Sequence, residues 1–211
     1  KISQNKKQKR QLLQTVTHIL ALIPLAIIIW YNYTNQLGAD PTNAIILRTG
    51  KAAIILLMLS LACTPVKILF GWNWTMSLRK MLGLYAMLYV SLHLLAFSWL
   101  DYLFDWEFIW EAVLDQRFVL IGFAAFLLLI PLTITSNKYS IRKLGKRWGK
   151  LHKLVYLIGV LAVIHFTWLV KNVYTEPIIF GLILGFLLLI RTSPVKSRVQ
   201  QWRKKRRAAG K

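Results

Sequence analysis

The sequence predicts an all-α membrane protein, a polytopic bundle of six transmembrane helices. Of its 211 residues, 56% are hydrophobic and only 17% are charged, which is too apolar for a water-soluble domain of this length. The charged residues separate six apolar runs, each close to the ~20 residues that span the hydrocarbon core of a bilayer. The runs cover residues 11–39, 52–66, 81–100, 118–137, 154–170 and 177–190.

Each run predicts one helix, and charged side chains at the ends of the two shortest runs help them to span. Arg48 and Lys51 flank the second run and Arg191 follows the sixth, and their long side chains can reach the headgroups. The first run is too long for a signal peptide and carries Pro24 as a candidate kink. The predicted helices cover residues 11–33, 45–65, 77–100, 117–135, 149–171 and 177–192.

The segment at 101–116, between the third and fourth helices, is rich in Trp and in acidic residues. This composition is typical of an amphipathic segment, so we expect it to lie along the outer interface of the membrane. No internal repeat is evident. We therefore expect one domain at 11–192, between a basic cytoplasmic arm at 1–10 and a basic cytoplasmic tail at 193–211.

The basic residues predict the orientation of the bundle. Of the 28 Lys and Arg, all but four lie in the amino-terminal arm, the second and fourth connections, or the tail. Because cytoplasmic loops carry an excess of such residues, both termini are predicted to be cytoplasmic. All seven Asp and Glu lie in or beside the opposite, outer connections. Orientation and contact with anionic membrane lipid thus explain the net charge of +21, and no nucleic-acid partner is expected.

Four histidines, His18, His93, His152 and His165, fall within or at the edge of predicted helices. An ionisable side chain inside a membrane span points to function, because it costs several kcal/mol when it is left without a partner. A single such histidine is most often explained by a hydrogen bond to a neighbouring carbonyl. Four together favour a cofactor, since no acid in the inner half completes a proton relay and no Cys or carboxylate completes a zinc or di-iron site.

Depth in the membrane relates two of these histidines. His93 lies 14 residues beyond Arg79 and His165 lies 13 residues beyond His152, which is roughly 20 Å along a helix axis in each case. If Arg79 and His152 mark the inner boundary, His93 and His165 share one level in the outer half. Two imidazoles at one depth can occupy both axial positions of one heme iron.

The inner half is open to several interpretations. His18 is a packed histidine, part of a quinol pocket, or the ligand of an inner heme together with His152. The basic residues Arg79, Arg142 and Arg147 are suited to heme propionates, to the phosphate of a flavin, or to lipid phosphate.

Several motifs at fixed spacing resemble the MsrQ family, the heme-binding membrane subunits of periplasmic protein-methionine-sulfoxide reductase systems. That family belongs to the ferric-reductase-like group of six-helix membrane proteins. The motifs are H-x5-P at 18–24, LGADP at 37–41, RTGKAA at 48–53, LRKMLGLYAMLYVSLH at 78–93, and TS-x5-RKLG-x2-W-x2-LH-x2-VY-x8-HF-x-W at 135–168.

The resemblance implies b-type heme and supports His93 and His165 as its ligands. Relatives in the wider group carry histidine pairs on the third and fifth helices, whereas Arg79 stands here where the inner partner would be. An inner heme would thus lack one ligand, so the resemblance implies one heme or two, with His152 as the ligand of a second heme or as part of the electron entry site.

The resemblance also implies a function in the bacterial inner membrane. Electrons would pass from the respiratory quinone pool, or from reduced flavin such as FMN, to a periplasmic molybdopterin-containing methionine-sulfoxide reductase that repairs oxidised proteins. The alternative is a ferric reductase, metalloreductase or superoxide-generating cytochrome b fed by a separate cytosolic flavin reductase, since no dinucleotide-binding motif follows the last helix. A transporter without redox activity is disfavoured, because the spans contain few charges.

Overall fold

The computed structural model describes the backbone of residues 2–170 and 174–209 and the side chains of residues 8–170 and 174–203. Within these ranges the chain is helical and contains no strand. The elements are α1 (Ile2–Tyr33), α2 (Pro41–Phe70), η1 (Asn73–Thr75), α3 (Met76–Ala96), the π-helical turn η2 (Phe97–Asp101), α4 (Trp106–Asp115), α5 (Arg117–Ile134), α6 (Lys138–Leu144), α7 (Lys146–Leu151), α8 (Leu154–Leu169), α9 (Thr175–Leu189) and α10 (Ser193–Ala209).

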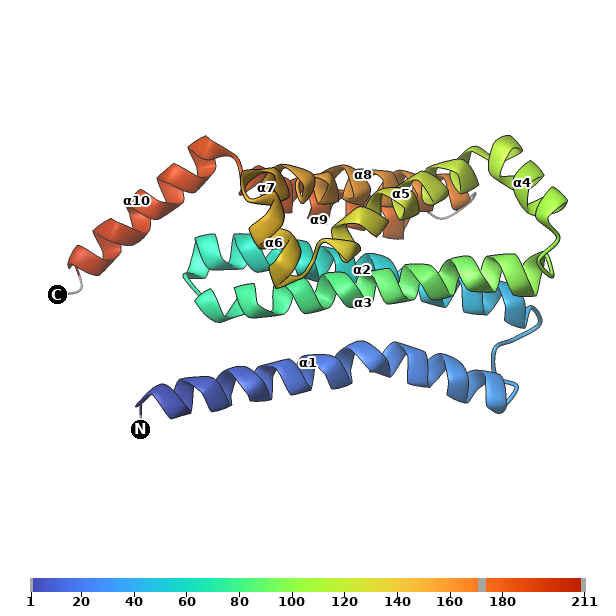
Figure 1. The fold of residues 1–211 in the computed structure, drawn as a ribbon, viewed down its shortest axis with the longest axis horizontal. Coiled ribbons are helices and arrows are strands. Elements are labelled where there is room, and N and C mark those ends of the chain that lie inside the picture. Colours follow the sequence, from blue (N-terminus) through green and yellow to red (C-terminus); the bar gives the residue numbers. More distant parts are fainter. Residues whose placement is uncertain (1, 171–173, 210–211) are drawn as a thin grey trace.

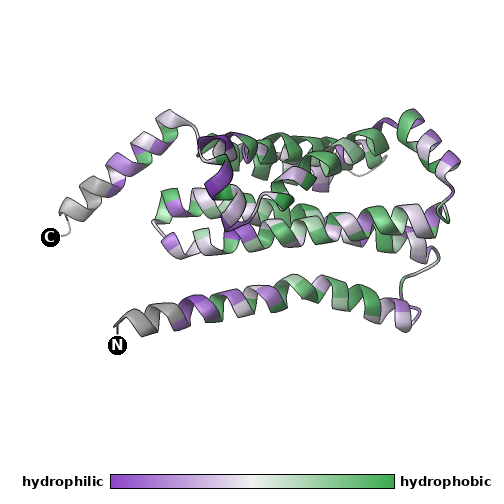
Figure 2. Cartoon of the chain, in the orientation of Figure 1, coloured by the Kyte–Doolittle hydropathy of each residue, from purple (hydrophilic) through white to green (hydrophobic). Residues whose placement is uncertain are grey.

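The long helices run along a common axis (Figure 1). In the described chain, five helical stretches are long and apolar enough to cross a membrane, and α9 with the start of α10 makes a sixth if this pair, bent by 69°, is one span. The prediction of a polytopic helical membrane protein is confirmed. Apolar residues dominate the middle of the bundle, and polar residues gather in α6, α7 and α10 (Figure 2).

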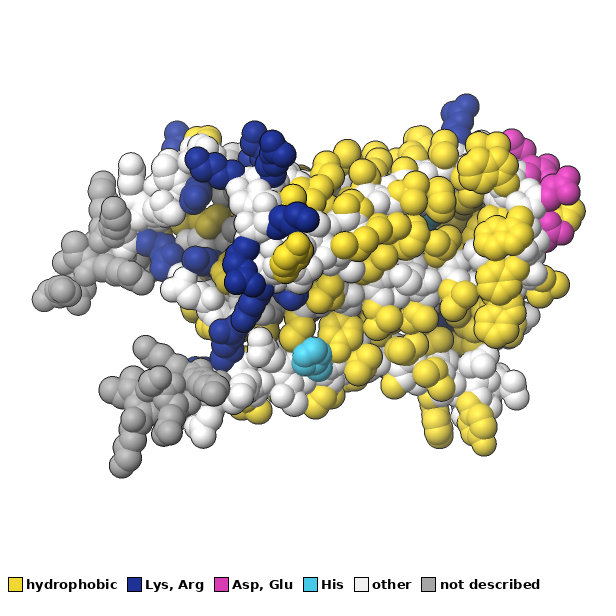
Figure 3. Space-filling model, viewed as in Figure 1, with side chains coloured by type: hydrophobic (Ala, Val, Ile, Leu, Met, Phe, Trp, Pro, Cys, Tyr) yellow, Lys and Arg dark blue, Asp and Glu magenta, His cyan; other side chains and the backbone are white. Residues whose placement is uncertain are grey.

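The two ends of the bundle carry opposite charges. Both termini lie at the end that holds α10, and α4 lies at the other end (Figure 1). Lys and Arg side chains gather around the end with the termini, and the visible Asp and Glu side chains gather around the opposite end (Figure 3). The predicted segregation of charge is therefore present, and the assignment of the basic end to the cytoplasm stays a prediction.

Several predicted boundaries were wrong. α2 begins at Pro41 rather than at 45, because the Asp40 side chain caps it by accepting from the Asn43 N–H, and it continues to Phe70, where Gly71 adopts a left-handed conformation (φ 76°). α1 begins at Ile2 rather than at 11, so the predicted basic arm is helical from that residue onward.

The fifth predicted helix is also divided differently. It was expected from 149, but two short helices, α6 and α7, precede it, and a turn at His152 and Lys153 separates α7 from α8. Its predicted end at 171 lies outside the described residues. Hydropathy did not reveal the break, because the turn is only two residues long and is flanked by Leu151 and Leu154.

Buried tyrosine and arginine side chains complete the backbone hydrogen bonds of the spans. The Tyr89 hydroxyl, which is 0% exposed, donates to the Ala21 carbonyl (2.7 Å) and accepts from the Leu25 N–H (3.0 Å). In a regular helix the Leu25 N–H would donate to the Ala21 carbonyl. Here, next to Pro24, the Tyr89 hydroxyl bridges these two groups instead. Tyr89 thereby joins α3 to α1.

A second such contact holds the end of α9. Pro65 in α2 has no N–H, so the carbonyl of Leu61 loses its partner within the helix. Arg191 donates to this carbonyl and, through Nη1, to the Tyr156 hydroxyl (2.8 Å). The cation therefore links α9 to α2 and α8 at a point where lipid could not satisfy the carbonyl.

Replacing Tyr89 with Phe should weaken the attachment of α1. The change removes one acceptor and one donor inside the bundle, and a buried polar group that loses its partner costs about 1–3 kcal/mol. Denaturant-induced unfolding in detergent micelles, followed by circular dichroism, should show this loss. Tyr33→Phe is the matched control, because it also removes a tyrosine hydroxyl and because Tyr33, at the end of α1, is 82% exposed. Equal stability of the two variants would contradict the anchoring role.

Candidate functional site

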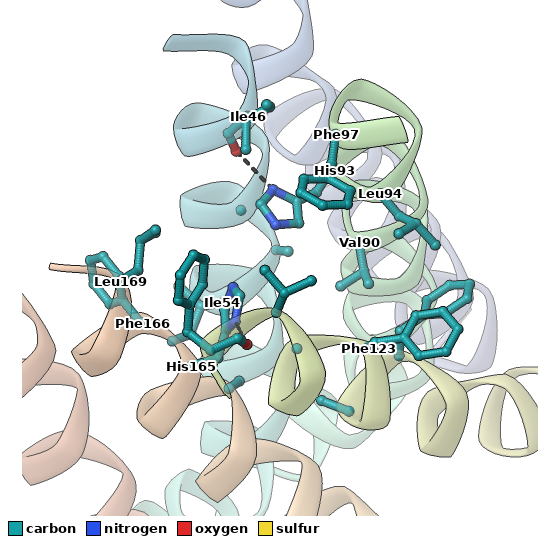
Figure 4. A pocket seen from close by; sticks show the side chains of 18 of the residues that line it. Ile46, Ile54, Val90, His93, Leu94, Phe97, Phe123, His165, Phe166 and Leu169 are labelled. Carbon is teal, nitrogen blue, oxygen red and sulfur yellow. Dashed lines mark hydrogen bonds between the residues drawn. The ribbon is translucent and has the colours of Figure 1, made fainter. Parts of the chain in front are cut away.

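A cavity of about 540 Å³ lies among α2, α3, α5 and α8, and α4 covers one side of it. Its lining is largely apolar (Figure 4). Two histidines face each other across it, His93 from α3 and His165 from α8. The centres of their rings are 6.1 Å apart and the ring planes are nearly perpendicular, at 86°. The structure thus brings together the two histidines that the depth argument placed at one level.

Each imidazole is fixed by a hydrogen bond to a backbone carbonyl of the neighbouring helix. Nδ1 of His93 lies 2.8 Å from the Ile46 oxygen, and Nδ1 of His165 lies 2.6 Å from the Phe118 oxygen. A carbonyl only accepts, so Nδ1 carries the proton in both rings and donates it. Nε2 of each ring therefore has a free lone pair, and both side chains line the cavity. Neutral imidazole with a free lone pair is the form that binds a metal.

Two glycines allow the imidazoles to approach the backbone so closely. Gly50 and Gly122 follow the accepting carbonyls by one helical turn. A Cβ at Gly50 would lie 3.1 Å from the His93 ring, and one at Gly122 would lie 2.6 Å from the His165 ring. A side chain at Gly122 would force the His165 ring to shift, and one at Gly50 would require the His93 ring to give by a few tenths of an ångström.

The two halves of the site repeat one arrangement. Ile46, Gly50 and His93 in α2 and α3 correspond to Phe118, Gly122 and His165 in α5 and α8, each shifted by 72 residues. The sequence G-x-A-A recurs at 50–53 and 122–125 at the same shift. The expectation of no internal repeat was wrong, and these glycines, which the sequence reasoning missed, could have been found by comparing the chain with itself.

The other predicted site residues lie elsewhere. His152 occupies the turn between α7 and α8, stacks on Trp148 with ring centres 4.1 Å apart, and has Nε2 3.1 Å from Oγ1 of Thr135. His18 has Nδ1 2.7 Å from the Tyr85 hydroxyl. The His18 and His152 rings therefore have separate partners, and the structure does not pair them.

The predicted arginines also lie away from the cavity. Arg79, Arg142 and Arg147 do not line it, and Arg142 and Arg147 are exposed on the short helices α6 and α7. The charged residue among the described lining is instead Lys51, whose Nζ lies 2.7 Å from Oε1 of Glu176 in α9. Sequence reasoning had assigned Lys51 only to the membrane interface.

Comparison with known proteins identifies the family. The model of the ferric reductase like transmembrane component matches residues 49–163. Curated relatives named protein-methionine-sulfoxide reductase heme-binding subunit MsrQ include those of Rhodospirillum rubrum, 41% identical over 91% of this chain and 93% of the relative, and Herminiimonas arsenicoxydans, 42% identical over 85% and 84%. The protein of Xanthomonas axonopodis pv. citri is 44% identical over 83% of each chain. The chain belongs to the MsrQ family.

The match to the ferric reductase model contains Gly50, His93, Gly122 and His152 and ends two residues before His165. The alignment with the Rhodospirillum MsrQ extends over 196 residues and so covers most of the bundle. No solved structure shows significant similarity to this MsrQ chain.

Proposed function

We propose that this chain is the membrane electron-transfer subunit of a methionine-sulfoxide reductase system and holds one b-type heme between His93 and His165. The facing pair of imidazoles carries this proposal. The names of the MsrQ relatives, which describe heme-binding subunits of a methionine-sulfoxide reductase, support it.

The geometry of the pair suits a shared iron. Metal–imidazole bonds are about 2 Å long and each nitrogen lies about 1 Å from its ring centre, so two rings on opposite sides of one metal have centres roughly 6 Å apart. The observed separation is 6.1 Å. No cluster of three or more His, Cys, Asp or Glu is present among the described residues. A metal held by two imidazoles therefore needs further ligands, which a porphyrin contains.

The surroundings suit heme as well. The cavity of about 540 Å³ falls within the roughly 300–1,000 Å³ typical of cofactor sites and is lined mainly by apolar side chains. Lys51 is the lining cation that would meet a propionate, in exchange for its ion pair with Glu176. The heme supplies one-electron redox chemistry at its iron. The carbonyls of Ile46 and Phe118 hold the rings in one tautomer and increase the electron donation of Nε2.

We assign one heme rather than two, because no second imidazole opposes His152 in the described chain. The donor is a quinol from the bilayer, with reduced flavin bound near Arg79, Arg142 and Arg147 as the alternative. Both termini face the cytoplasm of the inner membrane, and the end with α4 faces the periplasm. There a molybdopterin-containing catalytic subunit receives the electrons and reduces methionine sulfoxide.

His93→Ala and His165→Ala should each abolish the low-spin heme spectrum. Each change removes one of two axial ligands, so a six-coordinate low-spin iron can no longer form. Visible spectra of the purified, dithionite-reduced variants measure this. His152→Ala is the control and should retain the wild-type spectrum. An unchanged spectrum in both His93 and His165 variants would refute the site.

Gly122→Ala should disturb the site without removing a ligand. A methyl group 2.6 Å from the His165 ring must displace that ring, an overpacking that costs about 1–3 kcal/mol. We expect lower heme content, or a raised midpoint potential because the ring loses its carbonyl partner, and a smaller effect for Gly50→Ala. Gly185→Ala in α9 is the control, since nothing lies within 4 Å of an added Cβ there. Wild-type heme content and potential in both variants would contradict the role of these glycines.

The α4 end should be the docking surface for the catalytic subunit. Trp106 and Trp110 of α4 line the cavity, and the acidic residues of 101–116 are exposed around them. This mix suits a transient redox interface with a basic partner. The acids are Asp101, Asp105, Glu107, Glu111 and Asp115.

Neutralising Asp101, Glu107, Glu111 and Asp115 should slow electron transfer to the partner by roughly tenfold at low salt, because steering by opposite charges is lost. Asp105 should be kept, since its carboxylate caps α4 by accepting from the Glu107 N–H (3.1 Å). Stopped-flow oxidation of the reduced heme by the partner, over a range of salt concentrations, measures the rate. Heme content should be unchanged. Equal rates and equal salt dependence in variant and wild type would place docking elsewhere.

A further inference from the structure

A histidine and a tyrosine form an isolated polar pair on the outside of the bundle. Nδ1 of His18 in α1 lies 2.7 Å from the hydroxyl of Tyr85 in α3, and the two rings meet edge to face with centres 5.6 Å apart. His18 is exposed, as are its apolar neighbours Ile19 and Leu22 on the same helix. Both partners lie inside candidate membrane spans, so the exposed face of the pair meets lipid.

A polar imidazole is energetically unfavourable where it faces lipid. Elsewhere in the spans a buried polar group is satisfied inside the bundle, as the Tyr89 hydroxyl illustrates. Nδ1 of His18 bonds Tyr85, but Nε2 has no hydrogen-bond partner among the described residues. A ring nitrogen open to hydrocarbon is costly unless a ligand dissolved in the bilayer bonds it.

The pair is also aligned with the proposed heme ligand. Tyr85, Tyr89 and His93 follow one another at intervals of four residues along α3, so they lie on successive turns of nearly one face. Tyr85 and His93 are therefore roughly 12 Å apart along the helix axis. The exposed pair thus lies two helical turns from the imidazole that faces the cavity, with the buried Tyr89 between them.

We propose that the His18–Tyr85 pair is the binding site for the quinol head group, a deduction that rests on the proposed function and places its donor. The pair is suited to both redox forms of this ligand. When Nδ1 carries the proton and donates it to Tyr85, Nε2 accepts from a hydroquinone hydroxyl. When the Tyr85 hydroxyl donates to Nδ1, Nε2 carries the proton and donates to a quinone carbonyl.

The chemistry of the pair favours a quinol over a lipid headgroup. Phosphate is recognised mainly by Arg and Lys, through charge-assisted hydrogen bonds. This site offers an imidazole and a phenol instead, and the two aromatic rings add an edge-to-face surface for a planar ligand. A quinol also reaches the site directly from the bilayer, because His18 is on the lipid-facing side of α1.

The test uses the purified heme-loaded protein in nanodiscs and a decyl-substituted benzohydroquinone. His18→Phe keeps an aromatic ring but loses both nitrogens, and Tyr85→Phe loses the hydroxyl. Each loses hydrogen bonds to the ligand or to its partner, so heme reduction by the hydroquinone should become about tenfold slower. Reduction by dithionite should stay unchanged. Tyr33→Phe is the control for removing a hydroxyl from the surface of α1.

A second measurement does not depend on heme. An azido-substituted quinone should, on illumination, label peptides of α1 around His18 and of α3 around Tyr85, and the labelling should fall in His18→Phe. Competition by decyl-benzoquinone, but not by phosphatidylglycerol, should suppress it. Labelling confined to other helices, or suppressed equally by the phospholipid, would overturn the quinol site.

The experiments distinguish an error in the location of this site from an error in the identity of the electron donor. If the hydroquinone reduces wild type and both variants at equal rates, the site is wrong while the quinol donor stands. If dithionite reduces the wild-type heme but the hydroquinone does not, the quinol donor is wrong and the site falls with it. Slower reduction and lost labelling in the His18 and Tyr85 variants alone would support both.

Discussion

The contact between each cavity imidazole and a helix carbonyl is the constraint around which the site is built. In the bilayer no water satisfies Nδ1, so a ring that must offer Nε2 to a metal needs a protein acceptor for its other nitrogen. The carbonyls of Ile46 and Phe118 fill that role. Glycine stands one turn further along each helix, where an added Cβ would crowd the ring. The bond from Nδ1 to a carbonyl therefore depends together on how the helices pack, where glycine lies and how each ring is oriented.

The same rule orders the rest of the bundle. Tyr89 completes the ladder of α1 beside Pro24, and Arg191 serves the carbonyl that Pro65 leaves free. The ring nitrogens that lack a hydrogen-bond partner among the described residues therefore point to ligands. The pair across the cavity supports heme, and the open nitrogen of His18 supports a ligand from the bilayer. Both places are on α3, where Tyr85 and His93 lie about two helical turns apart.

Much of this could be predicted from the sequence, for physical reasons that differ by element. Apolar runs predicted the spans because lipid selects composition along a whole helix. The level shared by His93 and His165 followed from helical rise, although α8 begins only after His152 and the assumed continuous helix is broken there. The hydrogen bond of His152 to Thr135 and the role of Arg191 could not be predicted, because each depends on contacts between different helices. The recurring G-x-A-A is visible in the sequence, but the role of its glycine depends on the close approach of a histidine ring from another helix, which the sequence alone does not show.

We propose that one iron lies between two imidazoles in the half of the bundle nearest α4. An experimental structure of the protein purified with its heme, with an anomalous difference map recorded at the iron edge, tests it most directly. We expect one iron peak per chain, between Nε2 of His93 and Nε2 of His165. A peak beside His152 instead, or a cavity between His93 and His165 without iron in a preparation that contains heme, would contradict it.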